Sequence, residues 1–244
     1  MEESSLRGGF VTEVVRVGDT VRRSPGPNAA FVRELLTLFE RCGWPGAPRF
    51  LGVDDRGRET MSFLDGHVAW AEDQPPAVYA DGSLAELAEL VREFHDLTAA
   101  TELAANAEVV CHNDLSPKNT VYRDLDDGLR PYAFIDWDIA APGARVHDVA
   151  HICWQFVGLG PGLSDVAAAS RVRLICDAYG LDDRSHVVET ILWWQDRCWR
   201  GIETEAAAGD EAKIALRDSG VCAAIRAAHE WLAAHRRTFE IALR

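Results

Sequence analysis

The chain has 244 residues, of which 48% are hydrophobic, and its formal net charge is −14. This much apolar material excludes a disordered chain, and an acidic surface disfavours nucleic acid and anionic membranes as partners. The six cysteines are widely spaced without a C-x-x-C pair, so neither a zinc site nor a disulfide framework is expected.

The sequence shows no targeting or membrane-spanning segment. The first nine residues are polar and lack the apolar stretch of a secretory signal. No apolar run approaches the roughly 18 residues that a transmembrane helix needs. We therefore expect a cytoplasmic protein whose thiols stay reduced.

The first 66 residues favour a small β-rich unit with one helix. Residues 11–23 predict a hairpin around Gly18-Asp19, and residues 49–66 predict two more strands joined by a turn. Between these strand pairs, Asn28 is a candidate N-cap for a helix with one apolar face.

Helical patterns dominate after residue 66. Ser83 and Glu86 stand in capping-box spacing at the start of the first predicted helix. The later helices are predicted at residues 144–158, 164–179, 184–207 and 210–237. Because strand signals give way to helix signals near residue 65, two unequal lobes are expected, 1–65 and 66–244.

A polar loop separates short strand-like runs in the middle of the chain. These runs are residues 109–111, 120–122 and 133–135. Strand, loop, strand, turn and strand should bring Asp114, Asn119 and Asp136 toward one end of a small hairpin. Carboxylate and amide oxygens are ligands that suit Mg²⁺. Taken singly, each of these residues is also typical of an ordinary turn or strand end.

The spacing His112-x-Asp114-x4-Asn119, followed by Asp136, resembles the catalytic and metal-binding segments of the aminoglycoside phosphotransferase and choline kinase family. These enzymes are small-molecule relatives of protein kinases. The resemblance covers most of the chain in order. It implies an α+β, bilobal protein-kinase-like fold. Its small β-rich N-terminal lobe would bind the nucleotide, and its larger, mainly helical C-terminal lobe would carry the catalytic loop, the metal site and the acceptor site.

The same resemblance implies a small-molecule kinase that depends on Mg²⁺. It would transfer the γ-phosphoryl group of ATP or GTP to a hydroxyl of an aminoglycoside-like or amino-alcohol acceptor. Asp114 would be the catalytic base, and Asn119 and Asp136 would hold the metal ion. His112 and Asp148 would support the catalytic loop.

The phosphate-binding side departs from the family pattern. The family places a basic residue, usually lysine, on the third strand of the small lobe, but no lysine precedes Lys118. Arg22 or Arg23 could replace it, because arginine binds phosphate with a planar fork. Neighbouring strand residues face opposite sides, so only one of them can reach the cleft, and we favour Arg22. Glu34 is a candidate acidic partner.

Further nucleotide contacts are implied by the same resemblance. Ser62, Phe63 and Leu64 lie where the family's hinge offers backbone groups to the base. Gly8-Gly9 could approach the phosphates, although a plain turn explains this pair better. Asp138 either assists the metal through water or is a surface carboxylate.

The acceptor side has a weaker signal. Residues 191–211 are rich in tryptophan and in acid, and some of them could form a box for a cation or a sugar ring. The candidates are Trp193, Trp194, Trp199, Asp196, Glu203 and Glu205. Tryptophans at helical spacing are more often part of a core, and scattered acids more often a solvated face.

Two other functions stay open. A nucleotide-binding pseudokinase, acting as a regulatory or scaffolding module, would fit the absent lysine, but the intact Asp114 and Asp136 oppose it. A metal-dependent hydrolase could use His147 and His151 at i, i+4 spacing, but no third ligand suggests itself. The partners expected are a nucleoside triphosphate and a small-molecule acceptor, with no nucleic acid and no membrane.

Overall fold

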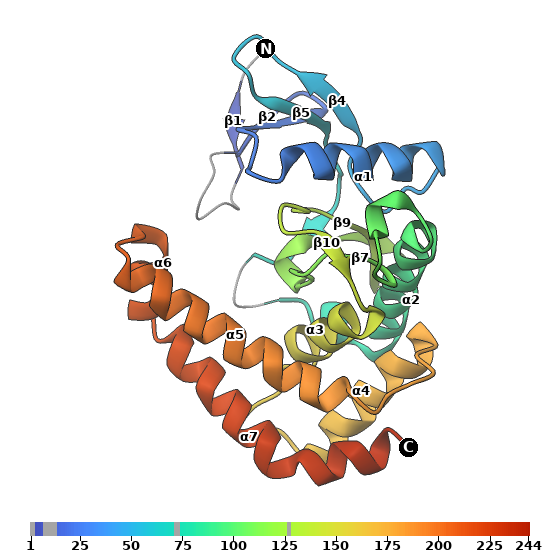
Figure 1. Ribbon diagram of the computed structural model, residues 1–244, viewed down its shortest axis with the longest axis vertical. Helices are drawn as coiled ribbons and strands as arrows, with labels where there is room; N and C mark the ends of the chain where they lie inside the picture. Colours follow the sequence, from blue (N-terminus) through green and yellow to red (C-terminus); the bar gives the residue numbers. More distant parts are fainter. Residues whose placement is uncertain (1–2, 7–13, 71–73, 126–127) are drawn as a thin grey trace.

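The structure is a computed structural model that describes residues 3–6, 14–70, 74–125 and 128–244. A small sheet with one helix lies above a larger, mainly helical part in Figure 1. The phosphate contact predicted at Gly8-Gly9 falls outside the described residues.

The first part of the chain forms an antiparallel sheet with the strand order β1-β2-β3-β5-β4. Its strands are β1 (Ser4–Ser5), β2 (Val14–Val17), β3 (Thr20–Arg23), β4 (Phe50–Val53) and β5 (Glu59–Ser62). The predicted hairpin around Gly18-Asp19 is confirmed, because β2 and β3 pair directly on either side of that turn. The two strands predicted within residues 49–66 are also confirmed.

Helix α1 (Ala29–Arg41) buries Leu35 and Phe39 in the main apolar core. The capping role predicted for Asn28 is wrong: the residue stands at the N-cap, but its side chain makes no capping hydrogen bond. Its amide nitrogen instead donates to the carbonyl of Ala140 at 3.0 Å and, less closely, to that of Asp138 at 3.4 Å. Asn28 therefore links the small sheet domain to a loop of the larger part.

The larger part contains the helices that the periodicity predicted. They are α2 (Asp81–Thr98), α3 (Arg145–Val157), α4 (Asp165–Tyr179), α5 (Val187–Ala207), α6 (Glu211–Asp218) and α7 (Val221–Ala242). The single helix predicted at 210–237 is wrong, because α6 and α7 are separate. Gly220 between them adopts a φ of 87°, which glycine takes at little cost.

The capping box predicted at the start of α2 is also wrong. The helix begins at Asp81, so Ser83 lies inside its first turn and is buried. Glu86 forms an ion pair with Arg130, with 2.9 Å between the charged atoms. Asp81 supplies the negative charge that favours the start of a helix.

In the middle of the chain, the described residues form two small sheets and three short 3-10 turns. β6 (His67–Val68), β8 (Thr120–Leu125) and β9 (Gly128–Phe134) form one sheet in the order β6-β8-β9, and β7 (Val109–Cys111) pairs with β10 (Ala141–Gly143). The 3-10 turns are η1 (Pro76–Tyr79), η2 (Glu102–Ala104) and η3 (Pro117–Asn119). The polar loop runs between these two sheets.

The apolar core extends through both parts of the molecule. An aromatic cluster at its centre joins α1, α2 and the strand β9, with neighbouring ring centroids 4.8 to 6.4 Å apart. Its members are Phe39, Trp44, Phe94, Phe134 and Trp137. The six cysteines are free thiols, as expected. Among the described residues, no helix has the length and apolar character needed to cross a membrane.

Candidate active site

The polar loop at residues 112–119 connects β7 to β8 and ends in the turn η3. β8 and β9 pair so that Thr120 lies opposite Phe134, and the N–H of Ile135 donates to the carbonyl of Asn119 at 2.9 Å. Asn119 directly precedes β8 and Asp136 follows β9, so both residues lie at the same end of the β8–β9 hairpin. This is the arrangement that the sequence predicted.

Asp114 and Asn119 are in direct contact. The side-chain nitrogen of Asn119 donates to the Asp114 carboxylate and to the Asp114 carbonyl, each at 2.8 Å. Because the amide nitrogen is engaged in this way, the amide oxygen of Asn119 is the atom left to bind a cation. Asp114, Asn119 and Asp136 all line one cavity.

Asp136 is directed into this cavity by its backbone and by its neighbour. Its φ of 63° lies in the left-handed region, which is uncommon for a residue with a β-carbon. The next residue, Trp137, is only 2% exposed, and its indole N–H donates to the Phe134 carbonyl at 3.1 Å. With Trp137 anchored in the core, Asp136 and Asp138 on either side of it both line the cavity.

The carboxylates at this point repel one another. Burial raises the pKa of Asp136 above its ordinary value, and the negative charges of Asp138 and Asp114 raise it further, while Arg23 opposes the shift. A divalent cation would relieve this repulsion, and the Asn119 and Asp136 oxygens are the donors that Mg²⁺ prefers. The residues present therefore fit the metal ion that the family resemblance implies.

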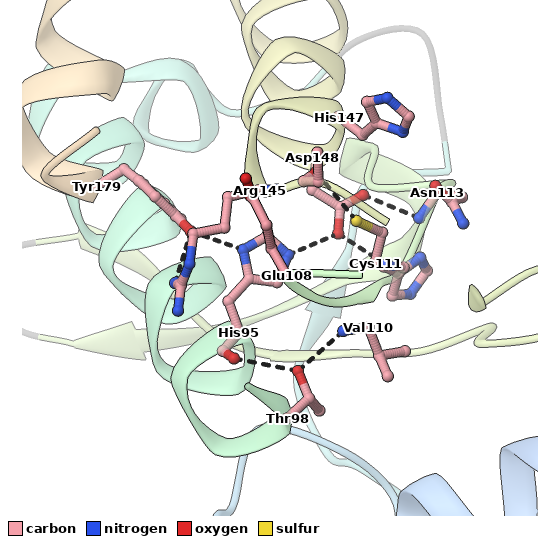
Figure 2. Close-up of polar contacts among 12 residues, drawn as sticks. His95, Thr98, Glu108, Val110, Cys111, Asn113, Arg145, His147, Asp148 and Tyr179 are labelled. Carbon is pink, nitrogen blue, oxygen red and sulfur yellow. Dashed lines mark hydrogen bonds and ion pairs between the residues drawn. The ribbon is translucent and has the colours of Figure 1, made fainter. Parts of the chain in front are cut away.

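A buried network holds the beginning of the loop (Figure 2). The Asp148 carboxylate accepts hydrogen bonds from the backbone N–H groups of His112 at 2.7 Å and Asn113 at 2.9 Å. His95 Nε2 lies 3.1 Å from the same carboxylate, and His95 Nδ1 lies 2.8 Å from the Tyr179 hydroxyl. Burial alone would raise the pKa of Asp148, but the hydrogen bonds with His95 and with the Asn113 N–H hold that pKa below the ordinary value.

His112 joins the loop to the strand that precedes Asp136. Its side chain is buried, and Nε2 lies 3.1 Å from the Ile135 carbonyl. The Asp114 N–H donates to His112 Nδ1 at 3.3 Å, so Nδ1 accepts and Nε2 carries the proton. These contacts put His112 in a position to hold the loop, with both ring nitrogens engaged.

The two histidines considered for a hydrolase make other contacts. His151 is buried and its Nδ1 lies 2.8 Å from the Leu115 carbonyl. The His147 ring stacks on Trp193, with 5.5 Å between ring centroids. These contacts add support to the catalytic loop and to helix α5, and they give no sign of a histidine metal centre.

Another group of potential metal ligands lies in the core. Within the described part of the chain, the ligand atoms of His95, Cys111 and Asp148 lie within 4.8 Å of one another. The Cys111 thiol donates to the Ala144 carbonyl at 3.3 Å, and burial raises its pKa. Because the thiol stays protonated and the other two side chains are bonded to each other, this cluster is part of the loop support.

The arginine that reaches the carboxylates is Arg23. It forms ion pairs with Asp138, with Asp136 at 3.8 Å and with Glu59 at 3.6 Å. The preference for Arg22 as the residue facing the cleft is wrong, since Arg22 pairs with Asp54 on the other side of the sheet at 3.4 Å. All four residues of β3 are partly exposed, so the sequence had no apolar alternation that distinguished the two faces.

The acidic partner of Arg23 is Glu59 of β5. Glu59 is 2% exposed, lies opposite Arg23 in the strand register, and also accepts a hydrogen bond from Arg33 of α1 at 2.7 Å. Glu34, the candidate considered from the sequence, is exposed on α1. The sequence held a signal that could have identified Glu59. Glu59 and Met61 are two residues apart in a predicted strand, so they share its inward face, and a carboxylate that is buried there needs a partner.

The predicted hinge residues Ser62, Phe63 and Leu64 line the same cavity. The N–H of Ser62 donates to the Arg49 carbonyl and that of Phe63 to the Asp19 carbonyl, both at 2.9 Å. Among the described residues, Leu64 has no such backbone partner.

The cation box considered within residues 191–211 does not form. Trp193, Trp194 and Glu205 line the cavity, which measures about 1770 Å³, but the other three candidates do not. Asp196 pairs with Arg200 at 2.8 Å, and Glu203 pairs with Arg226.

A small sheet above a larger helical part, with Asp114, Asn119 and Asp136 lining one cavity, is the arrangement of a kinase-like phosphotransferase. A family model described as the phosphotransferase enzyme family matches residues 47–180. The chain is also 31% identical to the trifolitoxin immunity protein of Rhizobium leguminosarum bv. trifolii over 271 residues, which covers 99% of both chains. The chain belongs to the phosphotransferase enzyme family, and the predicted enzyme class is confirmed.

Solved structures share the fold at low sequence identity. An aminoglycoside phosphotransferase from Streptomyces rimosus superposes with a TM-score of 0.58 at 15% identity, over 79% of this chain and 91% of that one. A choline/ethanolamine kinase family protein from Mesorhizobium loti superposes with a TM-score of 0.55 at 19% identity, over 97% and 93% of the two chains. The predicted α+β, bilobal protein-kinase-like fold is confirmed.

Proposed function

We propose that this phosphotransferase is a Mg²⁺-dependent small-molecule kinase that uses ATP or GTP and phosphorylates an acceptor hydroxyl. The observation that carries the proposal is the convergence of Asp114, Asn119 and Asp136 at one end of the β8–β9 hairpin, with Arg23 beside them. Transfer of a phosphoryl group depends mainly on placement and on neutralised charge, and this site offers both.

Each residue has a distinct role in the proposed reaction. Asp114 orients the acceptor hydroxyl and accepts its proton as catalytic base. The Asn119 side-chain oxygen and the Asp136 carboxylate hold Mg²⁺, which when bound neutralises charge on the phosphates. His112 and Asp148 keep the loop in place through the hydrogen bonds described above.

The nucleotide lies between the lobes in this proposal, with residues 1–65 as its binding lobe and 66–244 as the catalytic lobe. The Leu64 backbone contacts the base, while Ser62 and Phe63 shape the wall of that pocket. Arg23 binds the phosphates with its planar guanidinium and is held in place by Glu59.

Known ligands of relatives support the choice of substrates. The Streptomyces rimosus enzyme has been solved with ADP and streptomycin, and aminoglycoside 2′-phosphotransferase-IIIa with GDP. Acceptors of the aminoglycoside-like or amino-alcohol classes are therefore the first to test. A pseudokinase is not favoured, because the catalytic and metal-binding side chains are all in place.

A more specific role follows from the relative named for immunity to trifolitoxin, which matches 99% of this chain. We infer that phosphorylation inactivates a toxic small molecule. Cells that express this chain should then survive a toxin that kills cells expressing Asp114→Asn.

The deciding experiment measures transfer of labelled phosphate from ATP and from GTP. The acceptors are aminoglycosides, choline, amino alcohols and sugars, each with and without Mg²⁺. We expect Mg²⁺-dependent transfer to one acceptor class, lowered by about 10²- to 10⁴-fold in Asp114→Asn, with nucleotide binding largely kept. Comparable transfer by this variant would refute the assignment of Asp114.

A further inference from the structure

The acceptor end of the cavity has the opposite charge to the rest of the chain. Acidic residues outnumber basic ones by 39 to 25 in the whole sequence. Among the cavity-lining residues of α3, α5, α6 and α7, however, the charged side chains are Arg197, Arg200, Lys213 and a single acid, Glu205. Helices α5 and α7 pack side by side with α6 at their end, and they form this wall (Figure 1).

The chain's two lysines both line this cavity. Lys213 extends from α6, and Lys118 lies in the catalytic loop directly before Asn119. The Glu205 carboxylate is already paired with Lys213, at 3.2 Å. The single acid of the helical wall is therefore neutralised by a neighbouring base.

Two of the cations lack a carboxylate partner. Arg197 lies over the Trp193 ring, 5.4 Å from its centroid, and forms no ion pair with the described residues. Lys118 is exposed and likewise has no carboxylate within ion-pair distance among those residues. Unpaired positive charge on the wall of a cavity attracts an anionic ligand.

These cations and Asp114 line the same cavity. The Cys198 thiol lines the cavity, and its pKa is raised mainly by burial and also by the negative charge of Asp114. Lys213 and Lys118 act on the same thiol in the opposite sense. Asp114, Cys198 and both lysines therefore border one cavity.

The remaining wall is apolar, with one unsatisfied hydroxyl. Trp193 is 44% exposed, and Trp154, Leu159 and Ile225 also line this end of the cavity. The Ser116 hydroxyl is buried and has no hydrogen-bond partner among the described residues, although it lies two positions after Asp114. A ligand with an apolar body and polar ends matches this lining.

We propose that the acceptor is an alcohol with an apolar body that also carries an anionic group, a carboxylate or a phosphate. This inference rests on the kinase function proposed above, and it names an anionic alcohol in place of the aminoglycoside-like and amino-alcohol acceptors. Arg197 binds the anionic group, while the hydroxyl points to Asp114. A polycation such as an aminoglycoside would meet unpaired positive charge on this wall.

The test compares three probes that share a body and a hydroxyl but differ in charge: ω-hydroxydodecanoate, dodecanediol and ω-aminododecanol. Binding is measured by calorimetry with Mg²⁺ and a non-hydrolysable ATP analogue. We expect the carboxylate probe to bind about tenfold more tightly than the ammonium probe, with the diol between them. Equal binding, the reverse order, or no binding of the carboxylate probe would overturn the proposal.

Matched variants assign the effect to the wall. Arg197→Glu should remove or reverse the preference for the carboxylate probe. Arg173→Glu on α4 is the control, because Arg173 is exposed and does not line the cavity. An unchanged preference in Arg197→Glu, or an equal loss in the control, would contradict the assignment.

A second measurement needs no acceptor. In a Cys42→Ser background, Cys198 is modified with an anionic and with a cationic methanethiosulfonate reagent. The anionic reagent should react faster, relative to the same pair acting on free cysteine, and Arg197→Gln should reduce that advantage. The opposite order would overturn the inference. Neither binding nor modification requires phosphoryl transfer. A failure of this inference can therefore be distinguished from a failure of the proposed kinase function.

Discussion

The catalytic loop and the phosphate-binding strand border the same cavity but are held in different ways. The loop is fixed by two hydrogen bonds that its backbone N–H groups donate to the buried Asp148 carboxylate. Arg23 of β3 is held by ion pairs, and two of its three partners among the described residues, Asp136 and Asp138, lie in the proposed metal-binding segment.

This difference follows from what each region has to do. A base and two metal ligands act only in a narrow range of geometries, so their spacing follows the family pattern. Phosphate needs a positive charge within reach, and an arginine paired with Glu59 can provide one in place of the usual lysine. In the proposed site, the spacing of the loop residues matches the family pattern, and an arginine stands in for the family's usual lysine.

The largest effect is expected from Asp136→Ala. Loss of a metal-binding carboxylate should remove the Mg²⁺ dependence of nucleotide binding and weaken binding in the presence of metal by about 100-fold. Calorimetry with and without Mg²⁺ measures this change. Asp138→Ala, two residues further on, should lose less than about tenfold. Unchanged affinity in Asp136→Ala would remove this residue from the metal site.

The next largest effect concerns the loop support. Asp148→Asn puts an amide N–H against the backbone N–H groups of the loop, so we expect a loss of about 3 kcal/mol in the free energy of unfolding. Urea denaturation measures it. Asp177→Asn, on the half-exposed side of α4, should cost less than about 1 kcal/mol. If both variants lost the same amount, the buried network would not be what stabilises the loop.

A third prediction separates the two arginines. Arg23→Ala should weaken nucleotide binding by about 10- to 100-fold, because a charge-assisted phosphate contact is lost. Arg22→Ala should change it by less than about twofold, since Arg22 pairs with Asp54 instead. Arg23→Lys should recover part of the affinity. A larger effect at Arg22 would restore the preference that the sequence suggested.

The smallest effect expected is a dependence of stability on pH. Burial lowers the pKa of His95 below its ordinary value of about 6.5. The unfolded chain therefore binds more protons than the folded chain as the pH falls below that value, and stability decreases. The melting temperature should be lower at about pH 5.5 than at about pH 7.5, and His95→Gln should reduce the difference. A melting temperature that does not change over this range would contradict the prediction.

Local patterns predicted much of this molecule. The period of the apolar residues located α3, α4 and α5, and the turn residues located the hairpin of β2 and β3. The same method missed the break at Gly220, because a helix can tolerate one glycine and only packing shows whether it continues. It also misread Asn28, whose side chain bonds to a loop more than a hundred residues away.

The sequence by itself determined the catalytic loop. Asp114 and Asn119 are five residues apart in one loop, and Asn119 directly precedes β8. Asp136 follows β9, which pairs with β8, so short-range geometry is enough to bring the three residues together. Only the tertiary structure decided which arginine faces them, that Glu59 is its partner, and that Arg197 and Lys118 line the same cavity. These features join residues that are far apart in the chain. The charge at each point of the cavity, and the direction in which each side chain points, depend on how the strands and helices pack.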